Sequence, residues 1–219
     1  MIDFATARRH MVDGQVRPSD VTDLRIITAM LEIPRENFVP EKSRGLAYLD
    51  LDLGLGGAGA ATRSMMKPMV LSKLIQALDI EPTDKVLIVG AATGYSAAII
   101  ARMAAEVVAL EQDEGLVHLA KAALSGLANV QVVTGSLSAG YAAGAPYDAI
   151  LVEGAVEELP DAFWAQLKES GRLVCVLGAA TGSCAMSYRR SGEELGGRTV
   201  FDAVAAPLPG FAKAAEFAF

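Results

Sequence analysis

The stretch of residues 85–95 constrains the fold more than any other part of the sequence. Four apolar, mostly β-branched residues at 86–89 run into a turn with Gly90 and Gly94, and helix-forming residues follow at 96–103. A continuous apolar run bounded by turn residues is typical of a strand buried on both faces of a parallel sheet. Glycines let the chain turn sharply and let a ligand approach the backbone, and the next helix points free N–H groups at that ligand. The stretch therefore predicts a small-molecule site at the carboxyl end of a strand.

The spacing of the turn narrows the choice of ligand. A dinucleotide turn, Gly-x-Gly-x-x-Gly, would need a third glycine where Tyr95 stands, and the sequence has no Gly-Lys-Ser/Thr of a P-loop. What remains at 90–94 is Gly-x-Ala-x-Gly, which is close to the Gly-x-Gly-x-Gly turn of S-adenosylmethionine methyltransferases. An ordinary strand-to-helix turn without a ligand stays open as an alternative.

A second apolar run, at 107–110, ends in Glu111. An acidic residue at the end of the next strand, about 20 positions past the first glycine, is suited to accept both ribose hydroxyls of an adenosyl group. The alternative is that Glu111 caps a helix that starts near Asp113, where the helix dipole favours a carboxylate. Both interpretations place Glu111 at the same edge of the sheet.

Size and charge limit the class of protein. The chain has 219 residues, of which 52% are hydrophobic, enough for one large core and a small appended subdomain. Its 19 basic and 26 acidic residues give a net charge of −7, which argues against binding to a nucleic-acid backbone. No apolar run is long enough to span a bilayer, and the first residues do not read as a secretory signal. We expect no nucleic-acid or membrane partner.

Cysteine and histidine usage argues against a metal site. The two cysteines, Cys175 and Cys184, lie in apolar or small surroundings and are expected to be buried, reduced thiols of a cytoplasmic protein. His10 and His118 are expected on helix surfaces rather than as ligands. No Cys/His cluster has metal-ligand spacing, so no metal is predicted.

The first 80 residues are predicted to form a helical cap with a glycine-rich substrate loop. Residues 3–32 read as two helices, the first capped by Asp3 and the second by Ser19 or Asp20, with Leu24 in the apolar stripe of the second. The glycine-rich segment 45–62 is not expected to form a helix and is predicted to be a mobile loop, either a lid or a plain linker. A further helix is expected to begin at Pro68.

Residues 81–219 are predicted to form the cofactor-binding domain. Strands and helices alternate there, and the pattern then changes to strands joined by polar turns. This order predicts an α/β fold with a doubly wound, mostly parallel sheet, an antiparallel edge and a β-rich C-terminal tail. The strands are expected at 85–89, 107–110, 130–133, 149–152, 173–177, 184–189, 198–206 and 214–219, and helices near 113–125 and 160–167.

The chain resembles the protein-L-isoaspartate O-methyltransferase family over nearly its whole length. The most specific part is the N-terminal block, with Met-Val-Asp-Gly-Gln-Val-Arg at 11–17, Ala-Met at 29–30, Pro-Arg-Glu-Asn-Phe-Val-Pro at 34–40 and Leu-Ala-Tyr at 46–48. The resemblance implies a seven-stranded, Rossmann-like methyltransferase fold. It also implies a repair function, in which S-adenosylmethionine methylates the abnormal carboxyl of isoaspartyl residues in damaged proteins.

The resemblance also assigns site residues, and the sequence departs from the family at some of them. The family's acidic residue before the first turn glycine is Ile88 here, its middle glycine is Ala92, its adenine-side aspartate is Ser136, and its active serine is Met66. The resemblance places the catalytic positions at Ser64 and Met66. It places the cofactor at Gly90, Ala91, Ala92, Thr93, Gly94, Glu111, Gln112, Gly135 and Ser136.

Carboxyl methylation requires little acid–base catalysis from the protein. A carboxylate with an ordinary pKa near roughly 4 is ionised at neutral pH, so no general base is required, and positioning and exclusion of water do most of the work. We therefore expect a carboxyl methyltransferase for isoaspartyl residues or for another acid. A non-catalytic relative that acts as a binding or regulatory module is the alternative from another class, and a nicotinamide oxidoreductase is disfavoured by Tyr95.

Overall fold

The computed structural model describes residues 3–56, 63–178 and 182–213. Its main sheet has seven strands in the order β5-β4-β3-β6-β7-β8-β9. The first five of these lie parallel, and β8 and β9 add an antiparallel edge. The bounds are β3 Lys85–Val89, β4 Glu106–Glu111, β5 Val130–Thr134, β6 Tyr147–Val156, β7 Leu167–Leu177, β8 Cys184–Ser191 and β9 Glu194–Asp202. The predicted α/β sheet with an antiparallel edge is confirmed.

Strands β3 and β4 are parallel neighbours, as the two apolar runs predicted, with Val86 opposite Val107. The prediction that β7 begins at 173 was wrong, because Leu167 is buried opposite Tyr147 and an irregularity in register separates this pair from the rest of the strand. The predicted strand at 198–206 begins earlier and ends at Asp202. The predicted strand at 214–219 lies outside the described residues.

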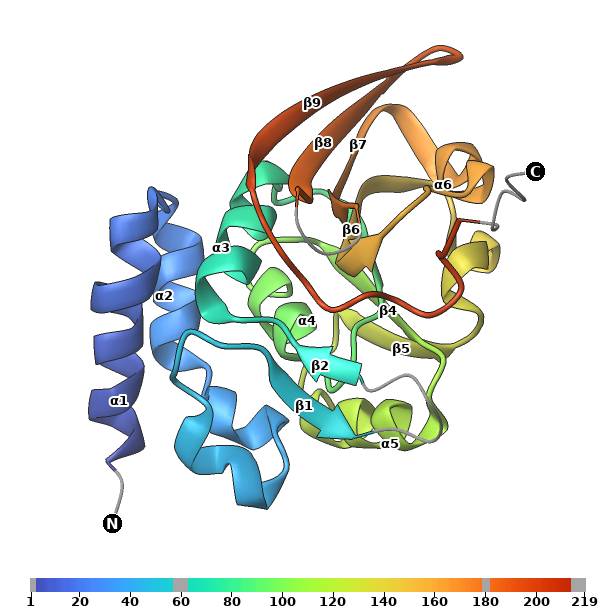
Figure 1. Ribbon diagram of the computed structural model, residues 1–219. Coiled ribbons are helices and arrows are strands. Elements are labelled where there is room, and N and C mark those ends of the chain that lie inside the picture. The colour runs from blue at the N-terminus through green and yellow to red at the C-terminus, as the bar shows by residue number, and fades with distance from the viewer. Residues whose placement is uncertain (1–2, 57–62, 179–181, 214–219) are drawn as a thin grey trace, which may run out of the picture.

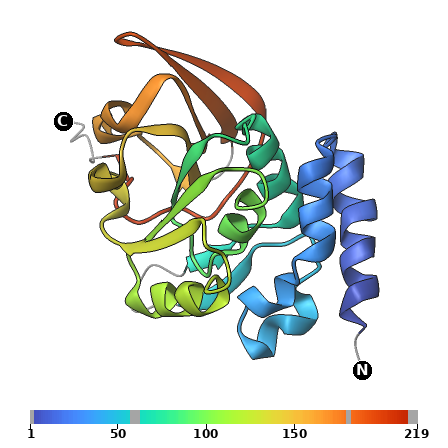
Figure 2. The same cartoon turned by 180° about the vertical axis from the view of Figure 1, so that it is seen from behind.

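Side chains of the parallel strands alternate between two apolar clusters, one on each face of the sheet. From β3, Val86 and Ile88 enter the cluster that holds α2, α3, α4 and α5, while Leu87 and Val89 enter the other. The second cluster is closed by Phe163 of α6 and by the segment after β9. Figures 1 and 2 show the sheet between these two layers. The helices are α2 Leu24–Glu32, α3 Pro68–Ala77, α4 Tyr95–Ile100, α5 Glu114–Ala123 and α6 Asp161–Gln166.

The N-terminal helices form an outer layer on one face of the sheet, in which α2 packs against α3 and α4 and α1 lies outside α2 (Figure 1). Helix α1, Phe4–Met11, begins as predicted at Asp3, whose carboxylate accepts from two backbone N–H groups of the first turn. The predicted caps of α2 were wrong, because Asp23 caps it by accepting from Arg25 N at 2.8 Å. Leu24 was also placed wrongly, since its side chain is 69% exposed and the buried face of α2 starts two residues later.

The glycine-rich segment 45–62 and the residues that flank it contain regular structure that the sequence did not predict. Residues Glu41–Leu46 form a 3-10 helix, and β1, Leu53–Gly56, pairs antiparallel with β2, Arg63–Met65. Leu53 and Leu55 are buried on alternate positions, which is the pattern of a half-buried strand. The prediction of a loop without a helix was therefore wrong at 45–46 and at 53–56. Residues 57–62, with Thr62 among them, lie outside the described residues.

Helix α3 begins at Pro68 as predicted and buries Leu71, Leu74 and Ile75. These side chains belong to the cluster that covers one face of the sheet. The division of the chain near residue 80 stays a prediction. No helix among the described residues has the length and apolar character needed to cross a membrane.

Candidate cofactor and acceptor site

The predicted turn joins β3 to α4 in a conformation that few side chains tolerate. Gly90, Ala92 and Gly94 all have positive φ, at 82°, 50° and 93°. The backbone N–H groups of Gly90 and Ala91 donate to Leu110 O at 2.9 and 3.0 Å, so the turn is tied to the end of β4. Ala92 holds the left-handed conformation at a cost of about 1–2 kcal/mol relative to the glycine that the family has there.

The two glycines of the turn make room for different neighbours. A β-carbon at Gly94 would lie 2.6 Å from Leu124 Cδ1, so glycine there serves packing against the end of α5. A β-carbon at Gly90 would lie 2.9 Å from Arg63 Nη2. The surface of the turn at Gly90 is thus covered by a side chain of this protein.

Glu111 is fully buried at the end of β4, and its carboxylate accepts four hydrogen bonds. Oε1 accepts from Gln112 N at 2.8 Å and Asp113 N at 3.2 Å. Oε2 accepts from Ala92 N at 2.9 Å and Arg63 Nη2 at 3.0 Å. Asp113 itself caps α5, so the helix-capping interpretation of Glu111 was wrong.

Arg63, on β2, was given no role by the sequence. Its side chain is 5% exposed and pairs with Glu111, and Nη2 also donates to Gly90 O at 2.9 Å. Its Nε is buried and has no hydrogen-bond partner among the described residues. The only local signal was a basic residue directly before the predicted acceptor residue Ser64.

A second buried acid, Glu153 on β6, was also missed. Ser96 Oγ, in the first turn of α4, donates to Glu153 Oε2. Burial raises the pKa of Glu153 to about 7, although the hydrogen bond from Ser96 and the charges of Arg63 and Arg35 act in the opposite direction. The sequence signal was an acidic residue directly after the apolar run at 149–152.

The N-terminal block docks directly on the turn. Arg35 is fully buried and donates from Nε to Ala47 O at 2.8 Å and from Nη2 to Met66 O at 2.6 Å. Its guanidinium lies 4.8 Å from the centroid of the Tyr95 ring, and burial lowers its pKa. Thr93 Oγ1 donates to Phe38 O at 2.7 Å. The side chains of Thr93 and Tyr95 therefore hold the helical cap.

Ser64 and Met66, the predicted acceptor positions, share one small cavity with Arg63 and Glu153. The cavity has a volume of about 10 Å³, which is room for about one water molecule. Ser64 is partly exposed, whereas the Met66 side chain is buried with 4% exposure. The structure thus brings the acceptor positions to the same edge of the sheet as the turn and Glu111.

The remaining predicted residues lie around that edge. Gly135 N donates to Glu111 O at 3.1 Å, while Gln112 and Ser136 are exposed. Ile88 lies in the apolar core and offers no polar group to the site. Among the described residues, no group of three His, Cys, Asp or Glu side chains is arranged to hold a metal ion.

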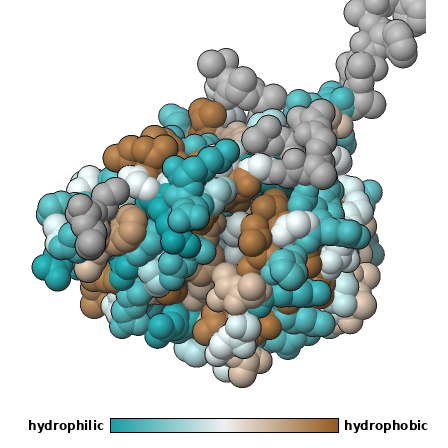
Figure 3. Space-filling view, turned by 90° about the horizontal axis from the view of Figure 1, so that it is seen from below, coloured by the Kyte–Doolittle hydropathy of each residue, from teal (hydrophilic) through white to brown (hydrophobic). Residues whose placement is uncertain are grey.

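The protein surface near the 3-10 helix and β1 is partly apolar. Leu46, Leu49 and Leu51 are all more than a third exposed, at 47%, 48% and 37%. Figure 3 views the molecule from the side of β1 and α5, where apolar side chains are interspersed with polar ones.

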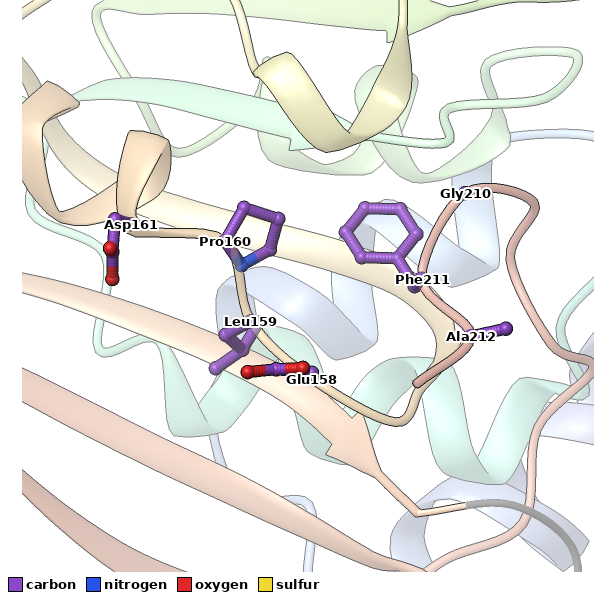
Figure 4. Close-up of a pocket in the computed structure, with 7 residues that line it drawn as sticks. All are labelled: Glu158, Leu159, Pro160, Asp161, Gly210, Phe211 and Ala212. Atoms are coloured by element: carbon purple, nitrogen blue, oxygen red, sulfur yellow. The ribbon is translucent and has the colours of Figure 1, made fainter. Parts of the chain in front are cut away.

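A larger hollow of about 280 Å³ lies past the end of β6. Pro160 and Phe211 stand on its opposite walls (Figure 4), and its other lining residues are Glu158, Leu159, Asp161, Gly210 and Ala212. It contains none of the predicted site residues and no buried charged group.

A strand, glycine turn and helix beside a buried acid on the neighbouring strand define the class of Rossmann-like, S-adenosylmethionine-dependent methyltransferases. Residues 7–208 match the family described as protein-L-isoaspartate(D-aspartate) O-methyltransferase. The chain belongs to this family.

Individual relatives agree with this assignment. The chain is 38% identical over 195 residues to a protein-L-isoaspartate O-methyltransferase of Methylorubrum extorquens, covering 88% of this chain and 83% of the relative. A protein of the same name from a Roseiflexus species is 36% identical over 211 residues, or 95% of this chain and 94% of the relative. A solved protein-L-isoaspartate O-methyltransferase superposes with a TM-score of 0.80 at 26% identity, covering 93% of this chain and 66% of that one.

Proposed function

We propose that this protein uses S-adenosylmethionine to methylate the free carboxyl of isoaspartyl residues in cytoplasmic proteins. The observation that supports this most is Glu111, a buried carboxylate held beside the glycine turn in a chain that matches the family from residue 7 to residue 208. The N-terminal block docks on the same turn through Arg35 and Thr93, so the donor and acceptor sides of the site are held together.

The residues at the edge of the sheet that holds the turn and Glu111 suit S-adenosylmethionine, the proposed methyl donor. The turn at 90–94 and Glu111 would hold the adenosyl ribose, with Gly135 and Ser136 on the adenine side. Arg63 Nε, a buried donor without a partner among the described residues, indicates that the space in front of the turn is built for polar groups. When bound, S-adenosylmethionine supplies a methyl group on a positively charged sulfur.

The protein's own contribution is to position the acceptor and to exclude water. Ser64 is the hydroxyl next to the proposed acceptor carboxyl, while Met66 offers only an apolar thioether. The acceptor carboxylate needs no base, because it is ionised at neutral pH. Holding the two reactants in line is then the main source of rate. We expect slow but measurable transfer.

The test is a radiolabelled methyl-transfer assay on an isoaspartyl peptide and on its normal aspartyl twin. Label is expected in the isoaspartyl peptide alone. Absence of label from both peptides, in protein that calorimetry shows to bind S-adenosylhomocysteine, would contradict the proposal.

A non-catalytic binding module is the second candidate. Two observations favour it. Ile88 brings no carboxylate to the site, and the Glu111 carboxylate, where a ribose would bind, already forms an ion pair with Arg63. This candidate predicts binding of S-adenosylhomocysteine without transfer to any carboxylate. Transfer to a small organic acid but not to the peptide would instead identify a methyltransferase for another acceptor.

A further inference from the structure

The hydrogen-bonding capacity of Glu111 is fully used in this structure. A carboxylate has about four lone-pair sites for incoming donors. Three are taken by the backbone N–H groups of Ala92, Gln112 and Asp113, and the fourth by Arg63 Nη2. A ribose that hydrogen-bonds to Glu111 must therefore displace one of these four partners.

Arg63 is the partner that is able to leave. The three backbone donors are fixed by the turn and by the residues next to Glu111 itself. Arg63 instead reaches Glu111 from β2, which pairs only with β1 in a separate two-stranded sheet within the described residues. Its Nη2 also donates to Gly90 O and covers the face of the turn where a ligand would lie.

We propose that Arg63 exchanges between two carboxylates. Arg63 forms an ion pair with Glu111 in the ligand-free protein. Once the ribose of the cofactor hydrogen-bonds to Glu111, Arg63 instead binds the carboxylate of the methyl acceptor. This inference rests on the proposed function, and it makes Arg63 the residue that recognises the acceptor's charge. It also implies an order of binding, with the cofactor before the acceptor.

A displaced Arg63 needs a new anion, because an unpaired buried charge is costly. Glu153 lines the same cavity, but it is bound to Ser96 and its raised pKa of about 7 leaves it partly neutral. Asp52, also at the cavity, is exposed and already accepts from Lys67 N at 2.8 Å. An acceptor carboxylate would bring a full charge, and the planar fork of arginine suits a carboxylate in two-point contact.

The first experiment measures S-adenosylhomocysteine affinity by calorimetry in wild type, Arg63→Gln and Arg63→Lys. Loss of the competing guanidinium should make Arg63→Gln bind about tenfold more tightly than wild type. The affinity of Arg63→Lys for S-adenosylhomocysteine should lie between those of wild type and Arg63→Gln, because lysine keeps the positive charge but lacks the planar guanidinium. Arg198→Gln, an exposed arginine on β9, is the matched control and should bind as wild type does. Equal or weaker binding by a folded Arg63→Gln would overturn the exchange.

The second experiment uses wild-type protein and so does not depend on the folding of a variant. An isoaspartyl peptide is titrated with and without saturating S-adenosylhomocysteine, beside a peptide whose isoaspartyl carboxylate is an amide. The carboxylate peptide should bind at least tenfold more tightly in the presence of S-adenosylhomocysteine, and the amide should show no such gain. Equal binding in both conditions, or no binding in either, would overturn the acceptor half of the proposal.

Methyl transfer separates this inference from the proposed function. If the wild type transfers label to the isoaspartyl peptide, Arg63→Gln should show a KM for that peptide raised at least tenfold. An unchanged KM would reject Arg63 as the recognition residue while leaving the enzyme's function standing. Tight S-adenosylhomocysteine binding with no transfer rejects the function instead.

Discussion

The guanidinium of Arg35 lies 4.8 Å from the ring centroid of Tyr95, and its Nη2 donates to Met66 O at 2.6 Å. The buried Arg35 side chain thus joins the N-terminal block both to Tyr95, next to the glycine turn, and to the predicted acceptor position Met66. This contact explains why a large aromatic residue stands where a dinucleotide turn would have glycine. Tyr95 provides the face on which the helical cap is held.

Replacing Arg35 with lysine should lower the free energy of unfolding by about 1.5–3 kcal/mol. The compact ammonium is not able to span both carbonyl oxygens as the guanidinium does, so one charged hydrogen bond is lost. Tyr95→Phe is the matched control, because it keeps the ring and removes only a hydroxyl without a partner among the described residues. Urea unfolding measures both variants. Equal losses would show that the guanidinium contacts are not what stabilises the cap.

Glu111→Ala should weaken S-adenosylhomocysteine binding at least tenfold, since each charged hydrogen bond to the ribose contributes about 1.5–3 kcal/mol. The variant should also be less stable than wild type, because Arg63 loses its buried counter-ion. Glu114→Ala, which removes an exposed acid at the start of α5, is the control and should bind normally. Unchanged affinity in Glu111→Ala, measured by calorimetry, would remove Glu111 from the cofactor site.

The central part of the fold was predictable because its signals are local. The apolar runs of β3 and β4, the glycines between them and the acid that ends β4 all lie within residues 85–111. Parallel pairing of the two strands then brings Glu111 beside the turn. Local pattern and tertiary structure agree here, so the sequence alone predicts that Glu111 and the glycine turn lie side by side.

The side chains that complete the site were not predictable, because they come from distant parts of the chain. Arg63 and Glu111 are 48 residues apart, and Ser96 and Glu153 are 57 apart. Neither pairing has a local pattern, since each depends on how β2 and β6 are placed in space. The close contact of Gly94 with Leu124 likewise depends on the docking of α5.

Met66→Ser should raise methyl transfer to an isoaspartyl peptide while lowering stability. A hydroxyl at this position would donate a hydrogen bond to the carboxylate of the methyl acceptor. Such a hydrogen bond is expected to raise the rate about ten- to a hundred-fold. The Met66 side chain is buried, so its loss should cost about 2–5 kcal/mol through the cavity left behind. Radiolabelled transfer and urea unfolding report the two effects.

Met69→Ser is the control for that variant, because Met69 does not line the cavity with Ser64 and Glu153. It should lose stability without gaining activity. A decrease in transfer by Met66→Ser, in protein that remains folded at the assay temperature, would show that the thioether itself supports the reaction.

The buried carboxyl of Glu153 should make stability fall as the pH rises. Burial raises the pKa of Glu153 from its ordinary value of 4.5 to about 7, so the folded protein holds a proton there that the unfolded chain releases. The contribution of protonated Glu153 to the free energy of unfolding is fully present below about pH 4.5 and is lost as the pH rises through about 7. The total loss is about 3 kcal/mol.

Glu153→Gln should remove this dependence, because the amide stays neutral and still accepts the hydrogen bond from Ser96. Urea unfolding at pH 5 and pH 8 tests the expectation in wild type and in the variant. The two should be similar in stability at pH 5, and the variant should be the more stable at pH 8. Glu158→Gln, at an exposed position, should follow the wild type at both values. A variant that lost as much stability as the wild type between the two pH values would show that Glu153 is already ionised in the folded protein at pH 5.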